Sequence, residues 1–169
     1  MKILIIGNGF DLNLGLKTSY KDFIQSNHFK TLLKNKNSMA EYFNEKSELN
    51  NWVDIEKEIT KYSIKVKDED LNIKKDFVEI KSALTNYLEE AQKKEINQDS
   101  KAFKILEEEI NNIDIIFNFN YTDSIFRIAE ILNQDIEDKH YHIHGSIKEQ
   151  NIIFGVEDDA DIKDEHIFF

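Results

Sequence analysis

Two glycines placed directly after an apolar run are the first residues in this sequence whose spacing indicates chemistry. Gly7 and Gly9 follow the run ILII of residues 3–6, and Gly15 comes after a short gap. A strand that ends in Gly-x-Gly and leads toward a helix favours phosphate binding, because glycine lets the backbone approach an anion and helix amides point at it. The pattern predicts a ligand-binding loop over residues 7–11, with a plain tight turn as the alternative.

The loop differs from the ordinary dinucleotide-binding fingerprint. That fingerprint has glycine at the position that Leu12 occupies here, and a second strand with an acidic end follows it soon afterwards. This sequence continues with helical patterns instead. The residues of the loop therefore leave the identity of its ligand open.

Three histidines form a second candidate site in the later part of the sequence. They alternate with other residues in the stretch HYHIHG, and they are His140, His142 and His144. A strand would place all three on one face, and this spacing with nearby carboxylates suits zinc or manganese. Such a metal site could activate a water, with carboxylates from Asp158, Asp159 and Asp161. The alternative is one functional histidine beside two ordinary, partly exposed ones.

Apolar patterns predict the strands that would position these residues. The β-branched and leucine run of residues 3–6 is typical of a central strand that is buried on both faces. Residues 113–119 form a second candidate strand. The alternating HYHIHG and the short IIFG of residues 152–155 predict two more.

Helical patterns fill the sequence between the first two strands. A helix is expected to begin near Tyr20, and apolar residues at three- and four-residue steps predict two long helices over residues 38–95. Residues 102–110 predict a shorter helix, and SIFRIAEIL predicts another after the second strand. The sequence thus indicates an α/β fold with a helical insertion, over about residues 38–110, between the first strand and the rest.

Composition bounds the class of function. The 169 residues suit one domain, and 40% hydrophobic with 33% charged residues is typical of a globular protein. The formal net charge of −11 makes a nucleic-acid partner unlikely, since phosphate backbones repel such a chain. The chain has no cysteine, which excludes disulfides and thiolate metal sites. No apolar run is long enough for a membrane span, and a strand explains the apolar start better than a signal peptide, so we expect a cytoplasmic protein.

Several motifs, taken in order, resemble those of one protein family. They are GNGFDLNLGLKTSYKDF, NNWVDIE, FNFNYTDSI and YHIHGSI with IIFG. Their combination is similar to the AbiH family of bacteriophage abortive infection over nearly the whole chain. A Gly-rich loop, an asparagine at a strand end and a His-Gly pair, in that order, also resemble the wider sirtuin-like (SIR2-like) group. The resemblance implies one domain over residues 1–169, a Rossmann-like and mostly parallel sheet, and NAD as ligand or substrate.

The resemblance also assigns roles to individual residues. It implies that Asn120 positions the ribose and a water, and that His144 is the general base for cleavage of the nicotinamide–ribose bond. The residues implied to bind NAD are Gly7, Asn8, Gly9, Phe10, Asp11, Thr18, Ser19, Tyr20, Asp123 and Gly145.

Two of the implied assignments have structural alternatives. The sirtuin-like motif has its aspartate two residues after the asparagine, where this chain has Thr122, so Asp123 could instead cap the following helix. Trp52, Asp54 and Glu56 match a family segment that would place a carboxylate over the pocket. Their alternative is a core tryptophan beside solvated acids.

The resemblance further implies that this chain is short at its C-terminus for the family. Missing strands would leave an open sheet edge that needs cover, from a second copy or from a partner chain. Three classes of function follow from the sequence. They are an NAD-cleaving enzyme of phage defence, a non-catalytic nucleotide-binding or interaction module, and a metal-dependent hydrolase using the three histidines.

Overall fold

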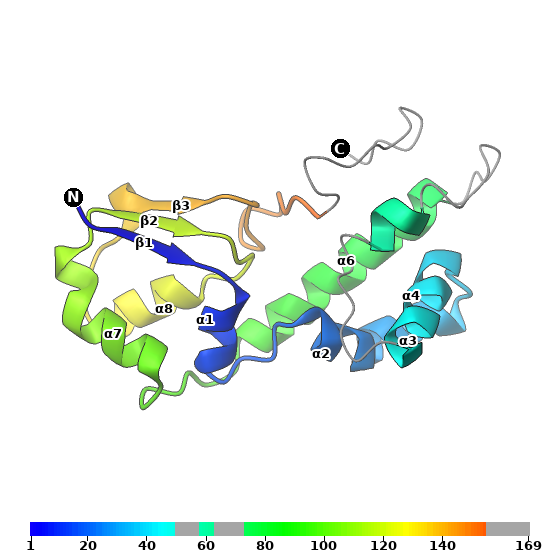
Figure 1. Cartoon of the computed structure of the whole chain (residues 1–169), viewed down its shortest axis with the longest axis horizontal. Coiled ribbons are helices and arrows are strands. Elements are labelled where there is room, and N and C mark those ends of the chain that lie inside the picture. Colours follow the sequence, from blue (N-terminus) through cyan, green and yellow to red (C-terminus); the bar gives the residue numbers. More distant parts are fainter. Residues whose placement is uncertain (50–57, 63–72, 155–169) are drawn as a thin grey trace. The chain divides into compact units, whose positions relative to one another are not determined.

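The computed structural model describes residues 1–49, 58–62 and 73–154, which divide into two compact units (Figure 1). The first unit comprises Met1–Ser19 and Leu88–Ile152. The second contains the described residues of 20–87 together with residues 153 and 154. One helix, α6 (Ile73–Gln92), contributes residues to both units. The single domain that the sequence predicts for the whole chain stays a prediction.

A parallel sheet of three strands forms the frame of the first unit. The strands are β1 (Ile3–Ile6), β2 (Ile115–Asn118) and β3 (His140–His142), in the order β1-β2-β3. Both pairings are parallel, and Ile5, Phe117 and Tyr141 lie side by side across the sheet. This arrangement is consistent with the α/β, Rossmann-like class, so the predicted fold class is confirmed. Because all strands point the same way, their carboxyl ends lie at one edge of the sheet.

Helices of the first unit lie on one side of its sheet (Figure 1). They are α1 (Asn8–Asn13), α7 (Lys101–Glu109) and α8 (Ser124–Ile131), with short 3-10 helices at Ile110–Asn112 and Glu137–Lys139. Helix α7 begins where the Ser100 hydroxyl accepts a hydrogen bond from the amide of Phe103 at 3.2 Å. The apolar faces of the helices pack against the sheet, and the core includes Ile6, Leu106, Ile116, Ile125 and Ile128.

The other face of this sheet is exposed, which corrects one prediction. The run ILII predicts a central strand buried on both faces, whereas β1 stands at an edge of the described sheet. Ile3 is 44% exposed and Ile5 is 68% exposed, while Ile6 is buried. The prediction was wrong because a continuous apolar run does not tell burial on one face from burial on two.

The second unit is helical in the residues that the structure describes. It contains α2 (Tyr20–Gln25), α3 (Asn27–Lys34), α4 (Ser38–Leu49), helical residues at 58–62 and most of α6. Phe23 is fully buried, with its ring edge-on to Phe29 at 5.4 Å, and Phe154 stacks on Phe77 at 5.6 Å. The predicted helices, including the one expected to begin near Tyr20, are confirmed where they are described.

Two further predictions of local structure are wrong. Residues 8–11 form the start of helix α1 rather than a loop, because the Phe10 amide donates to the Gly7 carbonyl at 2.8 Å and Phe10 packs against the core. Residues 152–154 do not form a strand. Packing explains the apolar side chains of Ile152 and Phe154, which are buried, and Phe154 stacks on Phe77. Within the described part of the chain, no helix is long and apolar enough to cross a membrane.

Candidate functional site

The candidate site begins where three parallel strands end at one edge of the sheet. Gly7 directly follows β1, Asn120 is the second residue after β2, and His144 is the second residue after β3. Backbone hydrogen bonds continue the ladder past the strand ends, from Phe119 to the Ile6 carbonyl at 2.9 Å and from Ile143 to the Asn118 carbonyl at 2.8 Å. Ligands of open α/β sheets bind at this carboxyl edge.

Asn120 links the ends of β1 and β2. Its side chain is buried, and its amide nitrogen donates to the Gly7 carbonyl at 3.1 Å and lies 3.4 Å from Asp11 Oδ1. Its backbone amide donates to Asn118 Oδ1 at 2.9 Å, which fixes the turn after the strand. Among the described residues, these side-chain bonds are made by the amide nitrogen of Asn120.

Asp11 forms the centre of a buried hydrogen-bond network. Its carboxylate accepts from the Thr122 hydroxyl at 2.6 Å and from the Ser124 hydroxyl at 2.5 Å, and only 1% of the residue is exposed. Burial raises the pKa of Asp11, while the hydrogen bonds from Ser124 and Thr122 lower it in part. Both carboxylate oxygens are engaged, so the structure places Asp11 beneath the strand ends as a link between α1 and the loop after β2.

His142 bonds to this network, and one of its ring nitrogens is buried without a hydrogen-bond partner among the described residues. Its Nδ1 lies 3.1 Å from the Asn120 carbonyl oxygen, and a carbonyl only accepts, so Nδ1 holds the proton in the neutral ring. Its Nε2 is buried and makes no hydrogen bond to any described residue. Asp123 Oδ1 faces this Nε2 at 3.4 Å, at a distance that forms an ion pair when the ring is protonated. His142 therefore attaches β3 to the Asn120 loop.

The neighbouring His140 makes packing and hydrogen-bond contacts within the fold. Its ring lies edge-on to His142 at 4.6 Å and to Phe126 at 4.5 Å, and its Nε2 is 3.2 Å from the Asn118 amide nitrogen. Burial, followed by the closeness of His142, lowers the pKa of His140 to about 4. The ring is therefore neutral at pH 7, and its Nε2 accepts from Asn118.

His144 lies apart from the other two histidines. The strand ends at His142, and the half-buried ring of His144 is edge-on to Phe119 at 5.4 Å. Among the described residues, no group of three or more histidines and carboxylates is placed to hold a metal ion. The carboxylates proposed for that metal, Asp158, Asp159 and Asp161, lie outside the described residues, as do Trp52, Asp54 and Glu56.

The glycines of the candidate site differ in what the fold requires of them. A Cβ added to Gly7 or to Gly9 would meet nothing within 4 Å, and Gly7 has an extended φ of −135°. Gly145 has a φ of +73°, and a Cβ there would lie 2.3 Å from the Asn151 carbonyl oxygen. The fold therefore requires glycine at Gly145, in a turn closed by the bond from the Ser146 amide to Asn151 Oδ1 at 2.8 Å.

A cavity of about 460 Å³ adjoins the two open glycines. The cavity is lined by consecutive residues of β1, by the start of α1 and by one side of α7. Its lining residues include Gly7, Asn8, Gly9, Phe10 and Ile105. Lys101 is the one charged residue among its lining residues. Its volume lies within the range of small-molecule sites, roughly 300–1,000 Å³.

The segment after α1 is divided between the two units. The Thr18 hydroxyl donates to Asn8 Oδ1 at 2.8 Å, so Thr18 supports the first residue of α1. Ser19 is the last residue of this part of the first unit. Tyr20 begins α2 in the second unit, where its ring lies 6.2 Å from that of Phe154.

Sequence reasoning missed the residues that connect these elements. Thr122, Ser124 and Asn118 supply the buried hydrogen bonds to Asp11 and to the loop after β2. The sequence offered His142 as a metal ligand or as an ordinary, partly exposed residue, whereas its ring bonds the Asn120 carbonyl. The one available signal is the polar Asn118 at the end of an apolar strand, since buried polar residues need partners.

The fold and the polar strand ends define an α/β protein with a Rossmann-like sheet and a candidate ligand site at its carboxyl edge. The chain matches the family model described as "Bacteriophage abortive infection AbiH" over residues 3–167, and it therefore belongs to the AbiH family. This membership confirms the resemblance and supports a role in bacterial abortive infection. No curated protein and no solved structure matches the chain.

Proposed function

We propose that this AbiH chain binds NAD at the carboxyl edge of its sheet and cleaves the nicotinamide–ribose bond in the bacterial cytoplasm during phage infection. The observation that carries the proposal is the open space at Gly7 and Gly9, where the Gly7 carbonyl also accepts a hydrogen bond from Asn120. The resemblance to sirtuin-like proteins supplies the identity of the ligand.

The residues present fit a dinucleotide in two respects. Neither Gly7 nor Gly9 is needed for the fold, because a side chain at either position would meet only open space. A ligand lying against the backbone would need that space. The adjoining cavity of about 460 Å³ is mainly apolar apart from Lys101 and two asparagines, which suits a planar base beside a charged pyrophosphate.

The proposed reaction needs a positioned water and a base. A water oxygen bonds to C1′ of the ribose while the bond from C1′ to nicotinamide breaks, and nicotinamide leaves with the electron pair. The products are nicotinamide, ADP-ribose and one proton, which His144 accepts as general base. Asn120 Oδ1 would position a ribose hydroxyl or the water. That Asn120 and His144 follow neighbouring parallel strands supports this assignment, and their opening into a shared cleft stays a prediction.

The direct test is to incubate the purified chain with NAD and to measure nicotinamide release by chromatography. We expect His144→Ala to lower the rate by about 10²–10⁴, the usual effect of losing a general base. Binding is measured separately by calorimetry, so that a loss of turnover can be told from a loss of affinity. Absence of both binding and turnover in the wild type would contradict the proposal.

Gly9→Ala provides a control that separates binding from folding. Gly9 lies inside α1, where alanine is the better helix former by about 1 kcal/mol, so the variant should be at least as stable as the wild type. If NAD lies against this backbone, the added methyl group should weaken binding by about tenfold or more, equivalent to ~1.4 kcal/mol. An unchanged affinity in Gly9→Ala would rule out an NAD site at the start of α1.

A non-catalytic nucleotide-binding module is the second candidate. The specific observation in its favour is that the Asn120 amide nitrogen and the Asp11 carboxylate are already committed to hydrogen bonds within the protein. Such a module would bind NAD and release no nicotinamide, and His144→Ala would leave its affinity unchanged. The calorimetric and chromatographic measurements together distinguish it from the enzyme.

A further inference from the structure

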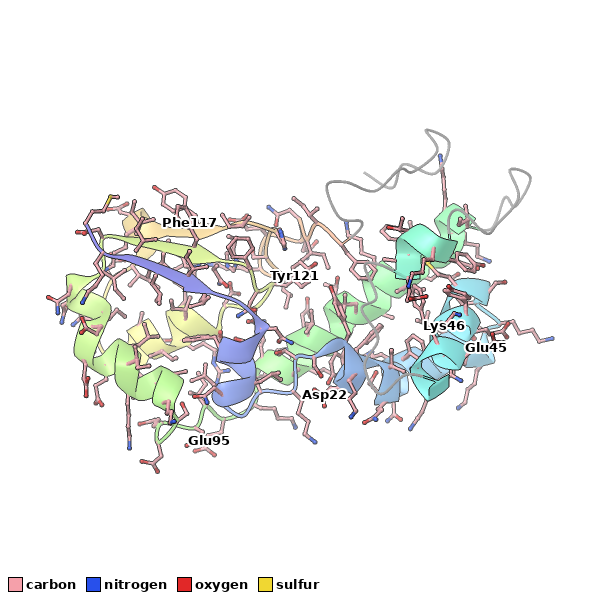
Figure 2. The ribbon with its side chains drawn as sticks, in the orientation of Figure 1. Asp22, Glu45, Lys46, Glu95, Phe117 and Tyr121 are labelled. Atoms are coloured by element: carbon pink, nitrogen blue, oxygen red, sulfur yellow. The ribbon has the colours of Figure 1, made fainter. Side chains whose placement is uncertain are left out.

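Among the described residues, helices cover one face of the first unit's sheet and leave the other face exposed. Alternation along the strands places Leu4, Ile6, Ile116 and Asn118 toward the helices. The opposite side chains form what we call the open face, which consists of Ile3, Ile5, Ile115, Phe117, Phe119, Tyr141 and Ile143. Figure 2 shows Phe117 on the side of the strands away from α7 and α8.

Exposure is large across the open face. Ile5 is 68% exposed, Tyr141 53%, and Ile3, Phe119 and Ile143 between 38% and 44%. Large side chains carry about 150–250 Å² each, so these five expose on the order of 500 Å² of mainly apolar surface. Scattered exposed apolar residues need no explanation, whereas a contiguous patch of this size is often functional.

The physics of parallel sheets strengthens this conclusion. All-parallel sheets occur almost only where both faces are covered, because their strands are apolar on both sides. In the described residues, the helices of the first unit cover one face only. The open face therefore has the chemistry of an interior surface without a layer over it.

We propose that a second copy of this chain covers the open face, so that two sheets pack face to face in a two-fold dimer. The charge distribution favours this occupant over a different partner. The chain has a net charge of −11, which repels a second copy over most approaches, whereas the open face contains no Lys, Arg, Asp or Glu. A partner selected by charge would bind the acidic surface instead.

Area and geometry also suit a dimer. A standard interface buries about 800 Å² on each partner, and homodimer interfaces are more apolar than transient ones. The five exposed side chains would supply the apolar centre of such an interface, with neighbouring residues as its rim. Two sheets pack about 10 Å apart, and a two-fold axis would bring Phe117 and Tyr141 of each copy close to the same residues of the other. This proposal concerns the face of the sheet, in addition to the open edge that the sequence predicts.

The first test is the molar mass in solution, measured by light scattering during gel filtration over about a hundred-fold range of protein concentration. The wild type should show twice the mass of one chain at the higher concentrations. Ile5→Asp and Tyr141→Asp should each weaken dimerisation by about tenfold or more, since each places a charge within the apolar interface. Val78→Asp is the matched control, because Val78 is 62% exposed on α6 and outside the open face.

The second test uses the absence of cysteine from the chain. Tyr141→Cys gives a single reactive thiol on the open face, and Val78→Cys gives one on α6. A short bis-maleimide should cross-link Tyr141→Cys into a covalent dimer and leave Val78→Cys without a cross-link. Circular dichroism checks that each variant is folded.

Three results would overturn the proposal. They are a wild type that stays monomeric at every concentration, a dimer that survives both aspartate substitutions in folded protein, and cross-linking at Val78→Cys but not at Tyr141→Cys. A monomer would mean that another segment of this chain or a different protein covers the face. None of these outcomes depends on NAD binding. Refuting the dimer would therefore not refute the proposed function, and the reverse also holds.

Discussion

Replacing Asp11 tests whether the buried network holds the strand ends together. The carboxylate accepts hydrogen bonds from the Thr122 and Ser124 hydroxyls at 2.6 and 2.5 Å, and Asn120 Nδ2 lies at 3.4 Å. In Asp11→Ala these buried donors lose their acceptor. Each such group costs ~1–3 kcal/mol, and the two hydroxyls are close enough to bond each other in part, so we expect the free energy of unfolding to fall by ~2–4 kcal/mol.

Asp11→Asn separates the charge of this side chain from its hydrogen bonds. Burial raises the pKa of Asp11 above its ordinary value of 3.8. A carboxyl with a raised folded-state pKa contributes stability below its unfolded-state pKa, and that contribution is lost as pH rises through the folded-state pKa. Asparagine does not ionise. The stability of Asp11→Asn relative to the wild type should therefore increase as pH rises from 3.8 through the raised value.

Urea unfolding followed by circular dichroism gives both quantities, at mildly acidic and at neutral pH. Hydrogen exchange of the β1 and β2 amides adds a local probe of the strand ends. The control is Asp99→Ala, because the Asp99 side chain is 96% exposed. It should change stability by no more than about 0.5 kcal/mol. The reasoning fails if Asp11→Ala costs no more than this control, or if Asp11→Asn follows the same pH dependence as the wild type.

Two further substitutions test the turn after β3 and the attachment of that strand. Gly145→Ala should lower the free energy of unfolding by more than ~2 kcal/mol, because its φ is +73° and a Cβ would lie 2.3 Å from the Asn151 carbonyl oxygen. In the same thermal unfolding measurements, Gly7→Ala should change the free energy of unfolding by no more than about 0.5 kcal/mol. Equal effects at the two glycines would contradict this account. His142→Leu removes the hydrogen bond to the Asn120 carbonyl at 3.1 Å. It should cost ~1–2 kcal/mol and speed hydrogen exchange at residues 120–122, whereas unchanged exchange would show that His142 does not hold this loop.

Local patterns were sufficient to predict most elements of the sheet and its helices. The apolar runs that predict strands at residues 3–6 and 113–119 correspond to β1 and to β2 at Ile115–Asn118. Helix α8 forms where SIFRIAEIL predicts it. The exposure of Ile3 and Ile5 could not be predicted, because an exposed apolar side chain and a buried one look the same in a sequence. Only the three-dimensional arrangement shows which face has no helices.

The sequence allowed the residues at the strand ends of the candidate site to be predicted, but not the buried hydrogen bonds that hold those strand ends together. Gly7 and Asn120 could be assigned to one edge because parallel strands end together. The bonds from Thr122 and Ser124 to Asp11 join residues more than a hundred positions apart, and no local pattern reports such a contact. The motifs therefore pointed to segments that lie at one edge of the sheet, without telling exposed residues from buried ones.

Whether a residue faces a ligand or supports the fold decides how loss of activity should be interpreted in this protein. Asp11 and Gly145 lie in family motifs, but the structure gives both a role in folding, through the hydroxyl bonds of Asp11 and the positive φ of Gly145. Inactive variants at these positions would be expected whether or not NAD binds nearby. Gly9 is the more informative position, because the fold leaves the space above it empty and a methyl group there disturbs only a molecule that occupies it.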